Sequence, residues 1–142
     1  MKQTDVTALK KELQKTEAIL AEYGKTPSGL FRPPEGAVTP AQQALLSQMH
    51  YRVILWNIDT RDWASEPAEK IVPHVRENVR GGDILLFHDY VVGKNTTITA
   101  LRQLLPELLQ NGYRFVTVSE LLSYASEASA PSSAGADGCS SK

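Results

Sequence analysis

Apolar side chains recur at three- and four-residue spacing in four segments of the chain. This spacing places them on one face of an α-helix, so it predicts four amphipathic helices. The predicted ranges are 6–23, 39–49, 66–79 and 98–111. The second range begins with Thr39 and Pro40 and has Gln42 three residues after the threonine, a pattern typical of a capping box at a helix N-terminus. Pro106 should kink the fourth helix or mark its effective first turn.

Four short runs between and after these helices are nearly all apolar. They are residues 29–31, 52–58, 83–87 and 114–118. A strand with one face in water would alternate polar and apolar residues, so uninterrupted apolar runs that alternate with helices indicate a parallel sheet covered by helices. The predicted fold class is therefore α/β.

The segment after Tyr124 carries almost no large apolar side chain. Such a segment cannot offset the entropy lost on ordering. We therefore expect one domain in residues 1–124 and a disordered low-complexity tail in residues 125–142. The whole chain has 142 residues, whereas a closed α/β barrel usually needs about 200 or more, so one compact domain or a piece of one is expected.

Charge and cysteine content argue against several kinds of partner and of internal cross-link. The formal net charge of -1 gives no electrostatic reason to expect nucleic acid or an acidic membrane surface. Cys139 is the single cysteine, so neither an internal disulfide nor a cysteine metal site can form. The sequence shows no signal-peptide pattern and no apolar run of about 18 residues. It therefore predicts no membrane span and leaves the compartment unknown.

Charged and polar residues follow three of the apolar runs directly. In parallel α/β folds, functional groups gather at the carboxyl ends of the strands. The residues there are Arg32-Pro33-Pro34-Glu35-Gly36, Asp59-Thr60-Arg61-Asp62-Trp63 and His88-Asp89. Three consecutive strands therefore bring a guanidinium, carboxylates and an imidazole to one rim.

Each of these residues also has a structural interpretation. Arg32 could be a surface arginine and His88 a buried histidine, but the Pro-Pro-Glu-Gly sequence after Arg32 and the pairing of His88 with two other motifs favour function for both. Asp59 is equally well explained as a turn former or as a catalytic carboxylate. His50 and His74 stand in different elements and are interpreted as structural.

Taken together and in this order, the three motifs resemble a known family. R-x-P-x-G at 32–36, D-x-x-D-W at 59–63 and L-x-H at 86–88 are similar to the third, fourth and fifth motifs of the polysaccharide deacetylase, or NodB-homology, family (carbohydrate esterase family 4). The resemblance covers roughly residues 28–122, and residues 112–122 resemble the last strand and helix of the family. It implies a partial (β/α) barrel of the distorted seven-stranded deacetylase type, with parallel strands alternating with helices.

The resemblance also implies a reaction and roles for three residues. The reaction is metal-assisted hydrolysis of an N-acetyl group on an amino sugar or an O-acetyl group on a polysaccharide. His88 matches the general acid that protonates the leaving group, a role that suits imidazole because its ordinary pKa is near neutrality. Asp62 matches the carboxylate that tunes this histidine, and Arg32 matches the arginine that orients the catalytic aspartate.

Three further positions match substrate contacts of the family. Trp63 and Leu86 correspond to apolar residues that line the acetyl pocket, and the backbone N–H near Glu35 corresponds to an oxyanion donor. Many relatives have tyrosine at the position of Glu35, so its side chain is not expected to keep the same substrate contact.

The family's first two motifs do not occur in the sequence. They have T-F-D-D-like and H-[ST]-x-x-x-H-like patterns and supply the catalytic base and the ligands of a divalent metal, zinc or cobalt. We therefore expect the metal for the complete domain only, with its ligands absent from this chain. On this interpretation the chain is the C-terminal part of the domain, inactive by itself, and its open barrel edges favour self-association.

The function expected from the sequence is that of a carbohydrate N-deacetylase. The partner would be an acetylated polysaccharide, with peptidoglycan the first substrate considered and chitin-like or plant polysaccharides the next, and complete family members are usually extracytoplasmic or at the cell surface. A noncatalytic sugar-binding or interaction module is one alternative. A hydrolase that uses Asp59 and Asp62 as paired carboxylates is disfavoured, because residues so close rarely straddle a glycosidic bond.

Overall fold

The structure of the protein is a computed structural model that describes residues 5–64, 66–89 and 96–128. Within these ranges the chain forms helices, two-residue strands and two short 3-10 turns. In chain order they are α1 (Val6–Glu22), β1 (Leu30–Phe31), η1 (Pro34–Gly36), α2 (Pro40–Gln48), β2 (Arg52–Val53), β3 (Ile58–Asp59), η2 (Asp62–Ala64), α3 (Ala68–Asn78), β4 (Leu85–Leu86), α4 (Thr96–Gln110) and α5 (Val118–Ala128). No helix among the described residues is both long enough and apolar enough to cross a membrane.

The strands form two separate parallel pairs. In the first pair Leu30 of β1 lies opposite Arg52 of β2, and in the second Ile58 of β3 lies opposite Leu85 of β4. Parallel strands combined with helices confirm the predicted α/β class. The described residues show two pairs, so the seven-stranded barrel implied by the family resemblance stays a prediction.

All four predicted strands are longer than those observed, and two of them differ most from the structure. The run 52–58 is divided into β2 and β3, because the chain changes partners along it: the Ile54 N–H donates to the Phe31 carbonyl, whereas the Asn57 N–H donates to the Ile84 carbonyl. The run 114–118 forms no strand in the described part of the chain. Apolar composition favours a strand there, but a strand also needs a neighbour with which to form a ladder.

The helix predictions are close to the observed bounds. At the start of α2 the Thr39 side chain accepts from the Gln42 N–H at 3.2 Å, and the Gln42 side chain accepts from the Thr39 N–H at 2.9 Å, which confirms the capping box. Pro106 lies inside α4. Helix α5 continues to Ala128, so residues 125–128, expected to be disordered, are helical, and the rest of the expected tail lies outside the described residues.

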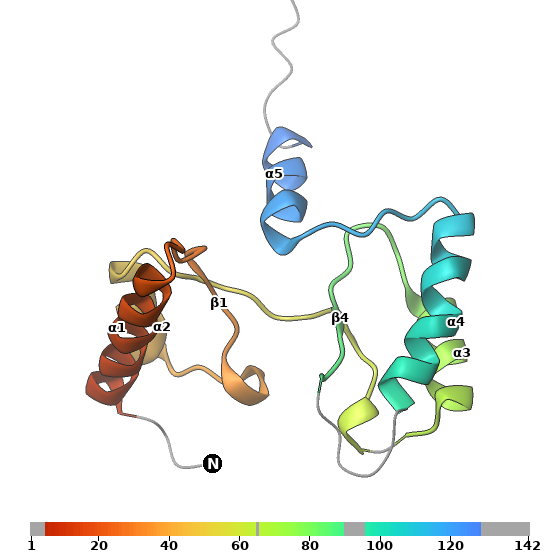
Figure 1. Ribbon diagram of the computed structural model, residues 1–142, viewed down its shortest axis with the longest axis horizontal. Helices are drawn as coiled ribbons and strands as arrows, with labels where there is room; N and C mark the ends of the chain where they lie inside the picture. Colours follow the sequence, from red (N-terminus) through yellow and green to blue (C-terminus); the bar gives the residue numbers. More distant parts are fainter. Residues whose placement is uncertain (1–4, 65, 90–95, 129–142) are drawn as a thin grey trace, which may run out of the picture.

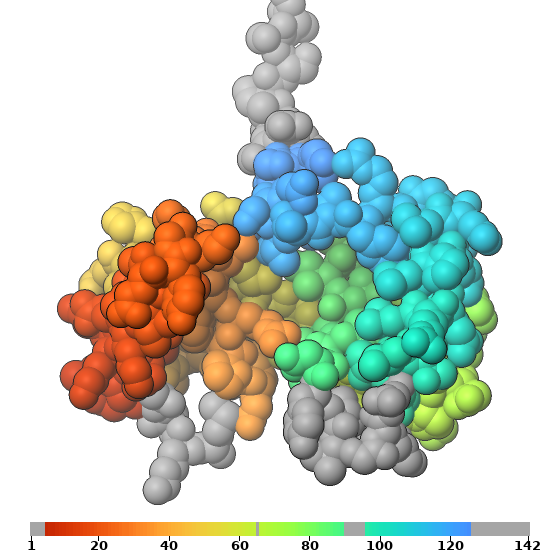
Figure 2. All heavy atoms as spheres, in the orientation of Figure 1, coloured from red at the N-terminus to blue at the C-terminus, as the bar shows by residue number. Residues whose placement is uncertain are grey.

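The elements are arranged in two regions joined by the segment between β2 and β3 (Figure 1). The first region, residues 6–53, contains α1 and α2 with β1 and β2; the second, the described residues between 58 and 110, contains α3 and α4 with β3 and β4. Helix α5 lies at the upper edge between them, and Figure 2 shows its side chains meeting those of both regions.

The main hydrophobic core belongs to the second region. Its buried members come from β3, α3 and α4 and from the residue that follows α3: Ile58, Ala68, Ile71, Val72, Val75, Val79, Ala100, Leu104 and Leu108. The first region buries Leu13, Leu45 and Leu46 where α1 meets α2. Two helices packed on a strand pair therefore give the second region a firm platform for the residues at its strand ends.

Candidate active site

The site is built on the two loops that leave β3 and β4 at their carboxyl ends. Thr60, immediately after β3, is buried, and its hydroxyl donates a 2.7 Å hydrogen bond to the carbonyl of Leu86 at the end of β4. This bond extends the contact between the two strands by one step beyond their backbone ladder. It sets the spacing between Asp62, which begins η2, and His88, which follows β4.

Asp62 is fully buried, and four donors satisfy its carboxylate. One oxygen, Oδ1, accepts from the Trp63 N–H at 2.9 Å and lies 2.8 Å from Nδ1 of His88. The other, Oδ2, accepts from the His88 N–H at 2.8 Å and from the Thr97 hydroxyl at 2.7 Å. An ionised carboxylate accepts about four hydrogen bonds. Asp62 therefore has a full set of partners and holds His88 at two points, its backbone and its ring.

These partners also set the charge of Asp62. Burial raises the pKa of the Asp62 carboxyl, but hydrogen bonds from the Thr97 hydroxyl and from the His88 backbone and ring outweigh this effect, so the pKa lies below its ordinary value. The group is therefore ionised at neutral pH. Because an ionised carboxylate can only accept, Nδ1 of His88 carries the proton in their contact.

The His88 ring is held from one side and open on the other. Its side chain is 33% exposed, whereas that of Asp62 is fully enclosed. With Nδ1 directed at Asp62, Nε2 is the ring atom left to exchange a proton with a bound molecule. A partly exposed imidazole backed by a buried anion is an arrangement that suits a general acid or base.

Asp59 and Trp63 shape the outer side of the same loop. Oδ1 of Asp59 accepts from the Arg61 N–H at 2.9 Å and from Nε1 of Trp63 at 3.3 Å, so its contacts support the turn-forming role. The Trp63 side chain remains exposed beside the Asp62–His88 pair. An indole fixed through its N–H and open on its faces can receive the apolar part of a ligand.

Arg32 and Glu35 lie on the first region, apart from the Asp62–His88 pair. Both are exposed, and Arg32 makes no hydrogen bond or ion pair with the residues that the structure describes. Arg32 lines a cavity of about 250 Å³ that Leu86 of β4 also lines. The structure thus brings Arg32 and Leu86 to one cavity, but it does not place Arg32 in contact with Asp62 or His88.

The turn after Arg32 is fitted against an indole near the start of β3. Glu35 and Gly36 have φ of 56° and 69°, and a Cβ added to Gly36 would lie 2.9 Å from Cη2 of Trp56. Glycine at this position therefore lets the backbone of η1 approach the ring closely. The turn is held near the junction of the two regions, with the Glu35 side chain directed to solvent.

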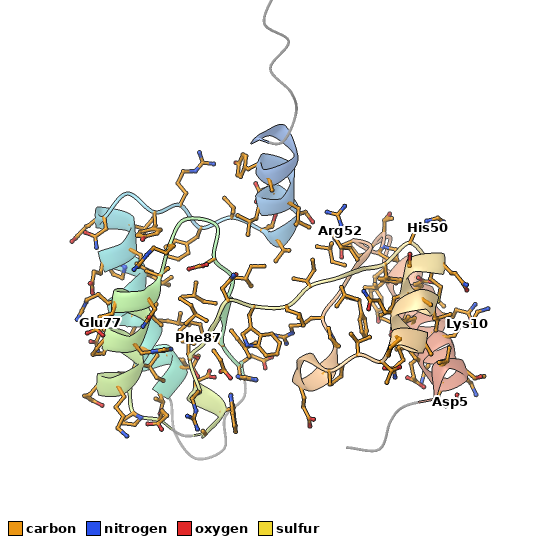
Figure 3. The ribbon with its side chains drawn as sticks, turned by 180° about the vertical axis from the view of Figure 1, so that it is seen from behind. Asp5, Lys10, His50, Arg52, Glu77 and Phe87 are labelled. Carbon is orange, nitrogen blue, oxygen red and sulfur yellow. The ribbon has the colours of Figure 1, made fainter. Side chains whose placement is uncertain are left out.

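The other histidines lie on elements other than those that carry the pair. Figure 3 shows His50 on the first region, on the opposite side of the molecule from Phe87, the neighbour of His88. His74 lies in α3, where its carbonyl accepts from Asn78. Within residues 5–64, 66–89 and 96–128, no group of three or more histidine, cysteine, aspartate or glutamate side chains could hold a metal ion. These residues do not fit a metal site, so no step is assigned to a metal here.

Sequence reasoning missed two threonines of the site. Thr60 stands inside the D-x-x-D-W motif at a variable position. Thr97 lies in the first turn of α4, which begins at Thr96, two residues before the start that the periodicity predicts. The available signal for Thr97 is a hydroxyl at the start of the helix that follows the L-x-H strand. A single threonine at that place belongs to no recognisable motif, so the sequence does not single it out.

No model of a protein family matches the chain, but individual proteins do. A peptidoglycan-N-acetylglucosamine deacetylase from Bacillus cereus is 47% identical over 97 residues, which cover 67% of this chain and 46% of that protein. The peptidoglycan-N-acetylmuramic acid deacetylase PdaC from Bacillus subtilis is 32% identical over 111 residues, which cover 78% of this chain and 22% of that protein.

Solved structures agree with the sequence matches. The structure of PdaC superposes with a TM-score of 0.75 at 30% identity, covering 87% of this chain and 58% of that chain. BA3943 from Bacillus anthracis, a pseudoenzyme of carbohydrate esterase family 4, gives a TM-score of 0.72 at 25% identity over 86% of this chain and 42% of that chain. The chain spans about half the length of the Bacillus cereus deacetylase. Motifs, fold and relatives together show that the chain belongs to the polysaccharide deacetylase family, carbohydrate esterase family 4.

Proposed function

We propose that this chain provides the acid part of the active site of a carbohydrate N-deacetylase that acts on amino sugars of peptidoglycan. The observation that carries the proposal is the Asp62–His88 pair, with its 2.8 Å contact and its filled set of donors. The substrate class follows the names of the relatives, which are peptidoglycan deacetylases. Such a substrate lies in the cell wall, which supports a place of action outside the cytoplasm.

The chemistry requires a proton at the leaving nitrogen. Hydrolysis of an N-acetyl group expels an amine, and an amine leaves readily only after its nitrogen is protonated. His88 supplies that proton through Nε2. Asp62 holds Nδ1 and stabilises the charged ring, so the proton is delivered from a fixed position.

The remaining rim residues bind and orient the substrate. Leu86 and Arg32 line one cavity, which suits an acetyl group with a polar neighbour. Trp63 presents its exposed ring beside the acid, and the backbone near Glu35 offers an N–H for the developing oxyanion. Arg32 orients the catalytic aspartate of the complete site through a charged contact.

Attack on the carbonyl needs an activated water that the described residues do not provide. In the complete domain a bound divalent ion, zinc or cobalt, would supply this chemistry by lowering the pKa of a water molecule. The described residues of this chain do not hold such an ion. The complete site would take its base and metal ligands from a segment other than these residues, and that segment would also close the (β/α) barrel.

A noncatalytic sugar-binding module is the second candidate. It is favoured by the lack of a metal-holding group among the described residues and by the similarity to BA3943, a pseudoenzyme of the family. A module of this kind would keep Trp63, Leu86 and Arg32 as a binding rim and would have no use for a buried carboxylate behind His88.

A fusion protein that adds the base and metal ligands tests the proposal. The part of the Bacillus cereus deacetylase without a counterpart in this chain would be joined ahead of Met1, and amine release from N-acetylglucosamine oligomers would be measured. We expect release by the fusion and none by the chain alone. A fusion that folds, binds zinc and oligomer, and releases no amine would contradict the deacetylase proposal and support the binding module.

A further inference from the structure

The fourth donor to Asp62 comes from an element that none of the three motifs includes. Asp62 lies in η2, and His88 follows β4, whereas Thr97 lies in the first turn of α4. Its hydroxyl donates to Oδ2 of Asp62 at 2.7 Å, the shortest of the four contacts. A third element therefore meets the acid pair through one neutral hydroxyl group.

The packing of α4 determines where this hydroxyl lies. Ala100, Leu104 and Leu108 follow Thr97 at intervals of three and four residues, so all four share one face of the helix. These three apolar residues are at most 4% exposed and belong to the core between α3 and α4. Any shift of α4 on α3 would therefore move the Thr97 hydroxyl relative to Asp62.

We infer that Thr97 is a positioning residue of the acid pair: its hydroxyl fixes the Asp62 carboxylate so that Oδ1 stays on Nδ1 of His88. The inference deepens the proposed function and rests on it for its catalytic meaning. Two donors on Oδ2, the Thr97 hydroxyl and the His88 N–H, fix the plane of the carboxylate. With one of them removed, the buried oxygen loses a partner and the carboxylate can turn away from the ring.

Nearby charges do not replace this hydroxyl. Asp59 and Arg61 lie on the Asp62 loop, and Asp59 bonds to the Arg61 N–H and the Trp63 ring. His88 already uses its backbone and ring on Asp62, and Asp89 next to it is exposed. The first turn of α4 has no acidic residue, and no basic residue lies among its first four positions. Thr97 is the group through which the described part of α4 contacts the carboxylate.

Titration by NMR of the full chain tests the inference without any assay of activity. Carboxyl carbon shifts would follow Asp62, and ring nitrogen shifts would follow the tautomer of His88. In Thr97→Val, which keeps the shape and removes the hydroxyl, we expect the pKa of Asp62 to rise by about one pH unit. The Nδ1–H signal of His88 should broaden or give way to a mixture of tautomers.

Three further variants make the result specific. Thr97→Ser keeps the hydroxyl and should restore both signals, and Thr97→Ala provides the comparison if the valine variant does not fold. Thr16→Val removes a hydroxyl that bonds within α1 and should change neither signal. A folded Thr97→Val protein with unchanged Asp62 and His88 titrations would overturn the inference and leave the deacetylase proposal standing. Normal titrations in a fusion without activity would contradict the deacetylase proposal alone.

Discussion

The two regions of the molecule differ in how their functional side chains are held. In the second region Asp62 is enclosed and all four of its partners come from residues of the same region, on the platform formed by α3 and α4. In the first region Arg32 is exposed and has no polar partner among the described residues. The second region thus holds its charged pair through its own contacts, while the first presents Arg32 to solvent without a comparable set of contacts among the described residues.

This difference separates the two halves of the proposed deacetylation site in physical terms. The proton delivery proposed for His88 depends on contacts within the second region, so its geometry can form without a metal or substrate. The orienting role proposed for Arg32 requires a carboxylate from outside the described residues. Variants in the two regions should therefore have different consequences.

The largest effect on stability is expected from Asp62→Ala. It would leave two backbone N–H groups, a hydroxyl and an imidazole, all partly buried, without their acceptor, and should lower the free energy of unfolding by about 3–5 kcal/mol. Asp59→Ala removes a carboxylate of the same motif that is only partly buried and should cost less than about 1 kcal/mol. Urea unfolding measures both. Equal losses would show that Asp62 is not held as described.

Removal of a core side chain should have different effects in the two regions. Leu104 and Leu46 are 1% and 0% exposed, so replacement of either by alanine should lower the free energy of unfolding by about 2–5 kcal/mol. Only Leu104→Ala should disturb the NMR signals of the His88 ring, because Leu104 shares its helix face with Thr97. A disturbance of His88 by Leu46→Ala of the same size would remove the distinction between the regions.

Acid should weaken the second region through Asp62. Because the pKa of Asp62 is lowered in the folded protein, its stabilising contribution is complete above the unfolded pKa, about 3.9, and is lost as the pH falls through the lower folded value. The pKa values of Glu107, bonded to Arg76, and Glu120, bonded to Thr117, are also lowered. The contribution of Asp62 is therefore measured as the difference in the free energy of unfolding between the wild type and Asp62→Asn, at intervals from pH 6 to pH 2. We expect this difference to shrink as the pH falls. If the two proteins lost stability in parallel over this range, the contribution assigned to Asp62 would be wrong.

The smallest effect is expected at the rim. Asp59→Ala removes the acceptor of the Trp63 ring N–H and should change the intensity and quenching of Trp63 fluorescence with little loss of stability. The same substitution in a Trp56→Phe background assigns the change to Trp63. Emission that Asp59 does not influence would mean that the indole is oriented by other contacts.

The sequence predicted those features that depend on local patterns. The helix periodicities and the Thr39 capping box set the bounds of α1 to α4 to within a few residues, and the three motifs identified Asp62 and His88 as candidates whose side chains the structure brings together. The strand lengths could not be predicted, because the change of partner between Ile54 and Asn57 depends on which strands lie beside them.

The contact of Thr97 with Asp62 also could not be predicted from local sequence patterns. A single threonine in the first turn of a helix has many structural uses, and only the packing of α4 on α3 brings its hydroxyl to Asp62. The placement of Arg32 apart from the acid pair has the same origin. It depends on how the two regions lie relative to each other and not on the R-x-P-x-G motif.

Turnover by the fusion protein with and without the His88 ring is the most direct test of the proposed chemistry. His88→Ala should lower the rate of amine release by roughly two to four orders of magnitude, the usual contribution of a positioned general acid. His74→Ala, at an exposed position of α3 where the histidine bonds to Asn78 and not to the pair, should leave the rate within about twofold of the unsubstituted fusion, as expected for a surface change that affects no catalytic contact. Full activity of the His88→Ala fusion across the pH range would contradict the assignment of His88 as the acid.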